Sequence, residues 1–152
     1  LWERLIFNGI SVNLSALKFL PRTEAGIQEA CRRAKQAFQH DEYDDEDWRS
    51  NSRYEIVCFT IMSNHIHLLI WLSDTVALYG IMHSLKRYIA AESNKILNKK
   101  GVFWQHENYD RVVRNGDEAN RIIEYILNNP VKIGLIANWE EWKWSFYNQK
   151  YI

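Results

Sequence analysis

The amino-acid sequence predicts an α+β fold, a sandwich in which helices pack mainly on one face of an antiparallel sheet. The main observation is the order of its segments, which run strand, helix, hairpin, helix, strand, helix. In addition, a chain of 152 residues is long enough to bury a core, and 47% apolar with 25% charged residues is ordinary for a globular domain. We therefore expect one domain spanning residues 1–152.

The first third of the chain contains a weak strand signal and a clearer helix signal. Residues 1–20 mix strand-like and loop-like character, and Gly9 interrupts them. Residues 23–39 carry apolar side chains at helical spacing, with Thr23 as the N-cap. The run DEYDDED at 41–47 holds six of the nineteen acidic residues, which is typical of a solvated loop. Although the whole chain has no net charge, the remainder therefore carries nineteen basic residues against thirteen acidic ones.

The middle of the chain predicts a β-hairpin followed by a helix. Residues 54–61, YEIVCFTI, alternate and are rich in β-branched and aromatic side chains, as strands are. A short connection leads into residues 65–72, HIHLLIWL, so the two strands are expected to pair as a hairpin. Apolar positions between 75 and 97 keep helical spacing, and Gly101 is expected to stop that helix.

The last third predicts a short strand, a helix and an aromatic tail. The strand covers residues 109–114, and the helix covers 118–128 with Asp117 as its N-cap. Pro130 is expected to end the helix, because a proline disfavours helical geometry in the residue before it. The tail, NWEEWKWSFYNQKYI, is expected to fold back onto the domain.

Composition excludes some classes of protein. No segment resembles a membrane-spanning apolar run or a cleavable leader, so we expect a cytoplasmic protein without a membrane partner. The two cysteines, Cys31 and Cys58, lie in apolar segments without ligand spacing and are expected to be buried free thiols.

Two histidines stand one residue apart at the head of the second hairpin strand. Because side chains alternate between the two faces of a strand, His65 and His67 must share a face with Leu69 and Trp71. Two neighbouring imidazoles are suitable ligands for a metal ion. The alternative is a pair of partly buried histidines that are satisfied by hydrogen bonds.

The predicted helix at 118–128 adds further polar groups. Tyr125 and Asn129 are four residues apart, so they share a helix face with Arg121, away from the apolar stripe. If this face lies against the histidines, two imidazoles, an amide oxygen and a phenol come together. Such a set can hold Mg²⁺ or Mn²⁺ and place a tyrosine nucleophile beside a phosphodiester. The product would be a 5′-phosphotyrosine link and a free 3′-hydroxyl. The alternatives are a half-buried tyrosine and an asparagine that stops the helix.

Five motifs together resemble the single-tyrosine HUH transposases, and most closely the branch associated with repetitive extragenic palindromes (REP). In chain order they are IMSNHIHLLIWL, LKRYIAAESNKILNK, FWQHENYDRVVRN, IIEYILNNPVKIGL and WKWSFY. The resemblance covers roughly residues 54–147 and implies a ferredoxin-like fold that acts on single-stranded or hairpin DNA. It also implies that Tyr125 is the catalytic residue and that His65, His67 and Asn129 are the metal ligands. The beginning of the chain matches the family's first strand poorly.

Cleavage of DNA requires phosphate contacts and stacking of unpaired bases. Candidates for the phosphate contacts are Lys86, Arg87, Lys95, Arg111, Arg114 and Arg121. Trp104 is the first candidate for stacking and Tyr109 the second. The alternatives are a solvated basic helix face and a tryptophan that belongs to the core.

Three functions compete for this sequence. The first is a metal-dependent endonuclease and strand transferase that acts through Tyr125, and the sequence favours it. The second is a nucleic-acid-binding module of the same fold without the chemistry. The third is a small zinc hydrolase with a water nucleophile, which would need a further carboxylate or histidine ligand. Both a monomer and a homodimer are compatible with the sequence.

Overall fold

The computed structural model describes residues 5–12, 54–62, 64–73, 77–96, 98 and 100–151. The strands in this part of the chain are β1 (Leu5–Val12), β2 (Tyr54–Ile61), β3 (His65–Leu72), β4 (Trp104–Val112) and β5 (Ser145–Tyr147). They form one antiparallel sheet in the order β4-β1-β3-β2-β5. The α-helices are α4 (Leu78–Ile96), α5 (Gly116–Leu127) and α6 (Asn129–Lys132), and the short 3₁₀ helices are η2 (Trp139–Glu141) and η3 (Gln149–Tyr151). An antiparallel sheet combined with helices confirms the α+β class.

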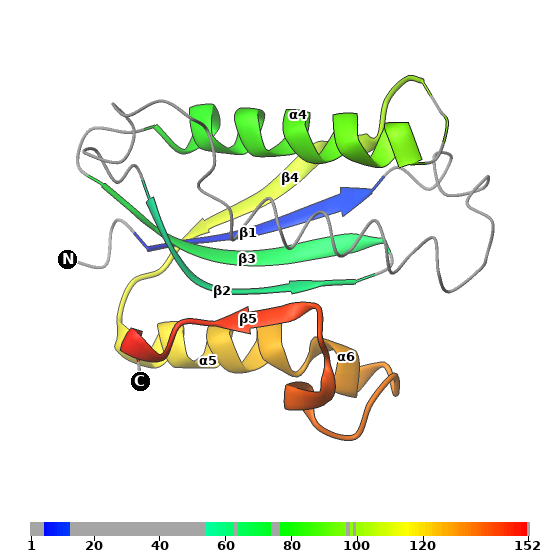
Figure 1. Ribbon diagram of the computed structural model, residues 1–152. Coiled ribbons are helices and arrows are strands. Elements are labelled where there is room, and N and C mark those ends of the chain that lie inside the picture. The colour runs from blue at the N-terminus through cyan, green and yellow to red at the C-terminus, as the bar shows by residue number, and fades with distance from the viewer. Residues whose placement is uncertain are drawn as a thin grey trace.

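The two long helices cover opposite faces of the sheet, α4 on one side and α5 on the other (Figure 1). Side chains alternate along β3, so Ile66 and Leu68 belong to the core under α4, whereas Leu69 belongs to the core under α5. We call these the α4-side core and the α5-side core. The expectation that helices pack mainly on one face therefore needs correction for this part of the chain. The reason is that the central strands are apolar on both sides, and each apolar side must be removed from water.

The hairpin expected from the sequence is confirmed at its predicted bounds, 54–61 and 65–72. The weak strand signal near the N-terminus corresponds to β1, which lies between β3 and β4. Within β1, Gly9 pairs with His67 on one side and with Tyr109 on the other. The segment with the weak sequence signal, β1, therefore joins β4 to β3, the strand that carries His65 and His67.

The helix and the strand that follow the hairpin differ from their predicted bounds. The helix α4 spans Leu78–Ile96, compared with a prediction of 75–97, and Gly101 beyond it has a positive φ of 109°. A glycine is favoured at such a φ because it lacks a Cβ atom. The strand β4 begins at Trp104, five residues before the predicted start, and ends at Val112.

The start of α5 corrects the prediction, whereas its end at Leu127 lies within one residue of the predicted end at 128. Its N-cap is Asn115 instead of Asp117, and the Asn115 side chain accepts a hydrogen bond of 2.9 Å from the backbone N–H of Glu118. Pro130 does not end helical structure, because it lies in the first turn of α6. At that position the missing N–H of proline has no helical partner to lose.

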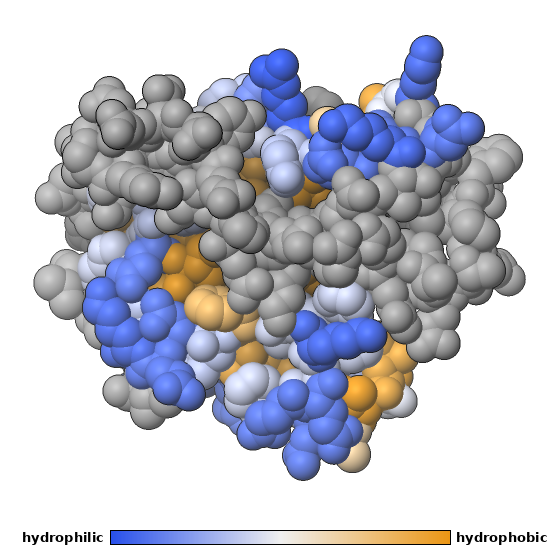
Figure 2. All heavy atoms as spheres, viewed as in Figure 1, coloured by the Kyte–Doolittle hydropathy of each residue, from blue (hydrophilic) through white to orange (hydrophobic). Residues whose placement is uncertain are grey.

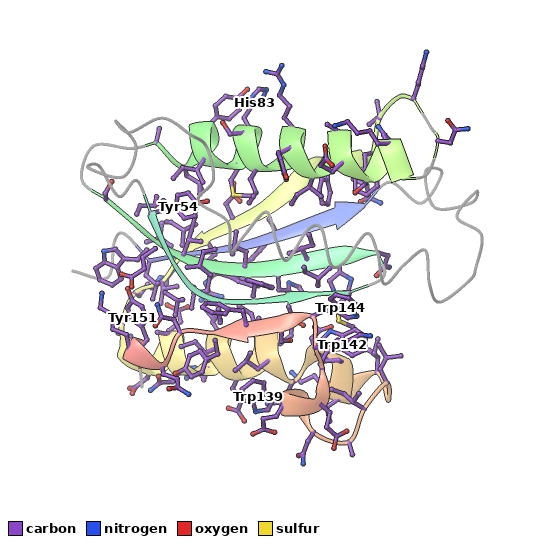
Figure 3. The ribbon with its side chains drawn as sticks, viewed as in Figure 1. Tyr54, His83, Trp139, Trp142, Trp144 and Tyr151 are labelled. Carbon is purple, nitrogen blue, oxygen red and sulfur yellow. The ribbon has the colours of Figure 1, made fainter. Side chains whose placement is uncertain are left out.

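The aromatic tail folds back onto the domain, as predicted. Its strand β5 pairs with β2 at the edge of the sheet. The indole N–H of Trp142 donates a hydrogen bond of 3.1 Å to the backbone oxygen of Ile61. Trp144 packs against the α4-side core, whereas Trp139 and Tyr151 pack against the α5-side core (Figure 3). The tail thus closes both sides of one sheet edge.

Some of the predictions concern residues that the structure does not describe. The predicted helix at 23–39, the acidic run at 41–47 and Cys31 lie outside the described residues. Cys58 is a buried free thiol, as expected, and burial raises its pKa far above the ordinary value. Among the helices that are described, none is both long and apolar enough to cross a membrane.

Candidate active site

The two histidines lie side by side at the start of β3, on the face that α5 covers. Their ring centroids are 4.7 Å apart. Between them, Ile66 points to the opposite face and is buried in the α4-side core. The expected alternation along the strand is therefore present, and both imidazoles face the same side as Leu69 and Trp71.

Tyr125 on α5 lies over this pair of histidines. Its ring centroid is 5.2 Å from that of His67. The helix is held there by the apolar residues next to Tyr125, because Ile126 and Leu127 are buried in the α5-side core. Tyr125 itself is 41% exposed, so a ligand from solvent can reach its side chain.

Asn129 lies at the start of α6 and joins the same group. It is a buried polar residue, and its side chain forms a hydrogen bond with His65. The helix α5 has ended at Leu127, and α6 begins only after Asn128. The structure thus brings together the four residues selected from the sequence, although they lie on three different elements.

The environment of the two imidazoles keeps them neutral at pH 7. Burial lowers the pKa of His67 to about 4, and the positive charge of Lys132, together with that of His65 whenever His65 is protonated, acts in the same direction. Burial also lowers the pKa of His65, against the hydrogen bond with Asn129, which favours protonation. Neutral imidazoles have lone pairs available for a metal ion.

The donor groups at this place fit a divalent cation. The Nδ1 atom of His67 is buried and has no hydrogen-bond partner among the residues described. Burying a polar nitrogen without a hydrogen-bond partner costs free energy, so such a nitrogen in a native structure indicates that the ring has a role in binding a ligand. Two neutral imidazoles and an amide oxygen are acceptable ligands for Mg²⁺ or Mn²⁺. Among the described residues, no three or more His, Cys, Asp and Glu side chains lie together in a group that could hold a metal ion.

Sequence reasoning missed Lys132, a cation next to the candidate nucleophile. Its Nζ atom lies 4.4 Å from the centroid of the Tyr125 ring. It is the last residue of α6, three positions after Asn129. A signal was present in the spacing, since Lys132 follows Tyr125 by seven residues, or about two helical turns.

Aromatic rings surround the histidine and the tyrosine. Phe7 of β1 is buried, and its ring centroid lies 5.7 Å from His67 and 6.3 Å from Tyr125. It also lies 6.0 Å from the ring of Tyr109, which is 57% exposed. Tyr109, the second stacking candidate, is therefore an accessible ring beside the site. Phe7 could not be selected from the sequence because β1 was poorly marked.

Three of the predicted DNA-binding arginines surround the start of α5. Their charges act on Glu118, whose pKa is lowered first by a hydrogen bond from the backbone N–H of Arg114 and then by Arg111, Arg114 and Arg121. Arg111 also forms a salt bridge with Glu118. Arg121 is exposed one turn before Tyr125 on the same helix. These side chains form a basic cluster at the end of α5 opposite to Asn129.

The other basic candidates lie on α4, on the opposite face of the sheet from Tyr125. Hydrophilic side chains gather over α4 at the top of the space-filling view (Figure 2). Arg87 and Lys95 are exposed, and Lys95 pairs with Glu92. Lys86 is only half-exposed, and burial lowers its pKa against the opposing effect of Asp110. The α4 residues therefore do not belong to the site around Tyr125.

Trp104 corrects a prediction. It is buried in the α4-side core, where its indole N–H donates a hydrogen bond of 2.7 Å to the backbone oxygen of Lys86. Its ring also packs edge-on against Phe103, with centroids 4.9 Å apart. A ring enclosed in this way cannot stack on a DNA base, so the expected stacking role is wrong and the core alternative holds.

The antiparallel α+β domain places a histidine pair beneath a helical tyrosine, as expected from the resemblance to the tyrosine transposases. The sequence model described as "Transposase IS200 like" matches residues 45–129, which is more than half of the chain. The protein therefore belongs to the IS200-like transposase family.

The similar proteins include a curated relative and a solved structure. A Haemophilus influenzae protein named "Putative REP-associated tyrosine transposase" is 24% identical over an alignment of 106 positions that covers 63% of this chain and 60% of that protein. The solved structure of a REP-associated tyrosine transposase bound to a REP hairpin superposes with a TM-score of 0.60 and 18% identity, covering 95% of this chain and 77% of that one. The structural likeness supports the fold, and the chain spans about 60% of the length of the curated relative.

Proposed function

We propose that this protein is a metal-dependent endonuclease and strand transferase that acts on single-stranded or hairpin DNA through a 5′-phosphotyrosine intermediate. The observation that carries the proposal is the position of Tyr125, whose ring lies 5.2 Å from that of His67 on the face that His65 and Asn129 share. Membership of a transposase family supports the same reaction class.

Tyr125 is the nucleophile in this proposal. Its phenolic oxygen attacks the phosphorus atom of the scissile phosphodiester, and the bond from phosphorus to the 3′ oxygen breaks. The phenolic proton passes to solvent, and the departing oxygen takes up a proton to become a free 3′-hydroxyl. The energy of the broken bond is kept in the phosphotyrosine link, which allows rejoining to another strand.

His65, His67 and Asn129 would hold the metal. Burial keeps both imidazoles unprotonated at neutral pH, because it lowers the pKa of each ring. A bound Mg²⁺ or Mn²⁺ ion would supply Lewis-acid polarisation of the phosphodiester. A hydrogen bond of 2.7 Å between Nδ1 of His65 and the side-chain oxygen of Asn64 fixes the orientation of one ring before any ligand arrives.

DNA is the proposed partner for two reasons. The structurally similar REP-associated transposase was solved with a REP hairpin bound. In this chain, the exposed ring of Tyr109 and the exposed Arg121 side chain flank the site on β4 and α5. An exposed ring can stack on an unpaired base, and a guanidinium can bind a phosphate.

The decisive test compares wild-type protein with Tyr125→Phe. Fluorescent hairpin oligonucleotides with single-stranded flanks are incubated with each protein and Mn²⁺, and covalent adducts are separated on a denaturing gel. We expect an adduct with wild type and none with Tyr125→Phe, while hairpin affinity changes by less than a few fold. Tyr109→Phe is the matched control, because it removes an exposed phenol nearby but should keep the adduct.

Two results would contradict the proposal. One is adduct formation by Tyr125→Phe at the wild-type level. The other is tight hairpin binding by the wild type without any adduct in Mn²⁺ or Mg²⁺, which would favour the DNA-binding module without the chemistry. Removal of the metal with a chelator should abolish the wild-type adduct and leave salt-sensitive DNA binding.

A further inference from the structure

Lys132 lies over the ring of Tyr125, the proposed nucleophile, and the reaction proposed above gives it no role. We propose that its ammonium group binds a non-bridging oxygen of the scissile phosphate and stabilises the negative charge that develops there while phosphorus is transferred to Tyr125. This inference rests on the function proposed above and adds a further residue to the same reaction.

The backbone holds Lys132 at a fixed place beside the site. Its N–H donates a hydrogen bond of 2.9 Å to the oxygen of Asn128, the residue that joins α5 to α6. The preceding residues Asn129 and Pro130 are buried, so α6 cannot move away from the sheet without exposing them. From this anchored turn, the side chain reaches back so that Nζ lies 4.4 Å from the Tyr125 ring centroid.

The charge of Lys132 acts on the site itself. Its Nζ atom lies against the Tyr125 ring, whose centroid is 5.2 Å from that of His67, so the ammonium group is close to the imidazole pair as well as to the tyrosine. A phosphodiester that approaches Tyr125 would therefore enter a region with a positive charge already in position. Such preorganised cations stabilise transferring phosphoryl groups without reorganisation during the reaction.

Lys132 also differs from other cations of the domain in its contacts. Lys95, Arg111 and Lys150 each form a salt bridge, with Glu92, Glu118 and Glu55 respectively. Within the described part of the chain, Lys132 forms no such pair, and its ammonium group lies over the Tyr125 ring. An aromatic face attracts an ammonium ion but leaves its N–H donors available for a phosphate oxygen.

A purely structural role is the alternative, in which the lysine only supports the ring of Tyr125. The two roles predict different responses to the charge of the substrate. A lysine that binds a charged phosphate oxygen loses its advantage when that oxygen is replaced by a methyl group. A lysine that only supports the ring matters equally for both substrates.

The experiment measures adduct formation under single-turnover conditions at saturating DNA. In a preliminary step, wild-type protein cleaves the normal oligonucleotide, and the length of the released fragment identifies the scissile phosphate. Two oligonucleotides are then compared, one with the normal phosphate and one with an uncharged methylphosphonate at that position. The proteins are wild type, Lys132→Met and Lys132→Arg. Lys143→Met is the matched control, because Lys143 also lies over an aromatic ring, at 4.9 Å from the Trp144 centroid.

On the normal substrate, we expect Lys132→Met to lower the rate by about a hundredfold, the usual effect of removing one such donor. On the methylphosphonate, wild type and Lys132→Met should differ by less than about threefold, since the charge that the lysine binds is absent. Lys132→Arg should recover most of the rate, and Lys143→Met should match wild type on both substrates.

Other outcomes overturn the inference. An equal loss on both substrates would assign Lys132 a structural role, and no loss on the normal substrate would assign it no role. In both cases wild type still forms the adduct, so the proposed function survives. If wild type forms no adduct at all, the proposed function fails and this inference fails with it.

Discussion

The sequence alone allowed two opposite roles for Trp104: an exposed ring that stacks on a DNA base, or a buried ring in the core. Its sequence context, FWQHENYDR, placed it in a connection near basic residues, where an exposed ring would suit a DNA base. In the structure it starts β4 and its indole bridges to the backbone of α4. The exposure of the ring decides between the two roles. That exposure depends on whether the side chain points into the core, as it does here, or toward solvent.

Trp104→Phe should therefore affect stability and not DNA binding. It removes the hydrogen bond to Lys86 and part of a buried ring, which together should lower the free energy of unfolding by about 1–2 kcal/mol. Urea unfolding followed by circular dichroism measures this loss. Hairpin affinity, measured where both proteins are folded, should stay within twofold. A variant that is as stable as wild type but binds the hairpin poorly would restore the stacking role.

The residues of the candidate site were predictable where short-range rules apply. Alternation along β3 put both histidines on one face, and the spacing of four residues related Tyr125 to Asn129. Lys132 was not selected from the sequence because the predicted helix stopped before Pro130. The local rule on residues before proline was correct in direction, but it did not reveal that a new helical turn begins there.

At the scale of elements, the C-terminal 3₁₀ helix η3 is attached to the sheet by one carboxylate. Glu55 of β2 accepts hydrogen bonds from Tyr151 at 2.7 Å and from Lys150 at 3.0 Å. Burial raises the pKa of Glu55, but the hydrogen bonds from Tyr151 and Lys150 outweigh it and hold the pKa below its ordinary value. The ionised form is therefore the one that holds η3 in place.

This attachment makes a pH-dependent prediction for Glu55→Gln. Because the folded state lowers the pKa, the stabilisation is present above the ordinary value of 4.5 and is lost as the pH falls through the lower, folded-state pKa. At pH 7 the variant should be less stable than wild type by about 1 kcal/mol, a modest value because the carboxylate is partly exposed. Urea unfolding across the range from pH 7 to pH 3 measures this difference, which should shrink below pH 4.5.

Glu140→Gln in η2 is the control for this prediction, since Glu140 is exposed. Its stability should follow wild type at every pH. A constant difference between Glu55→Gln and wild type at all pH values would show that the charge of Glu55 does not hold η3.

At the scale of the whole molecule, the sheet separates two polar surfaces. Tyr125 and the histidines lie on the α5 face, whereas Arg87 and Lys95 lie on α4, on the other face. Any contact of DNA with α4 is therefore remote from the proposed chemistry. Binding and cleavage should respond separately to substitutions on the two faces.

The double variant Arg87→Gln and Lys95→Gln tests this separation. If both side chains bind phosphates, the slope of log K against log salt should become shallower by about two. Fluorescence anisotropy with a hairpin between about 50 and 200 mM salt measures the slope. The rate of adduct formation at saturating DNA should stay unchanged. An unaltered slope would mean that the α4 face is only a solvated surface.

The sequence by itself determined the α+β class, the β2–β3 hairpin and the shared face of the two histidines, because these features follow from periodicities over a few neighbouring residues. Only the tertiary structure decided that α4 and α5 cover opposite faces and that β1 joins the histidine strand to β4. These features depend on which apolar surfaces bury one another. Such burial is non-directional and links residues far apart in the chain, so no local pattern specifies it.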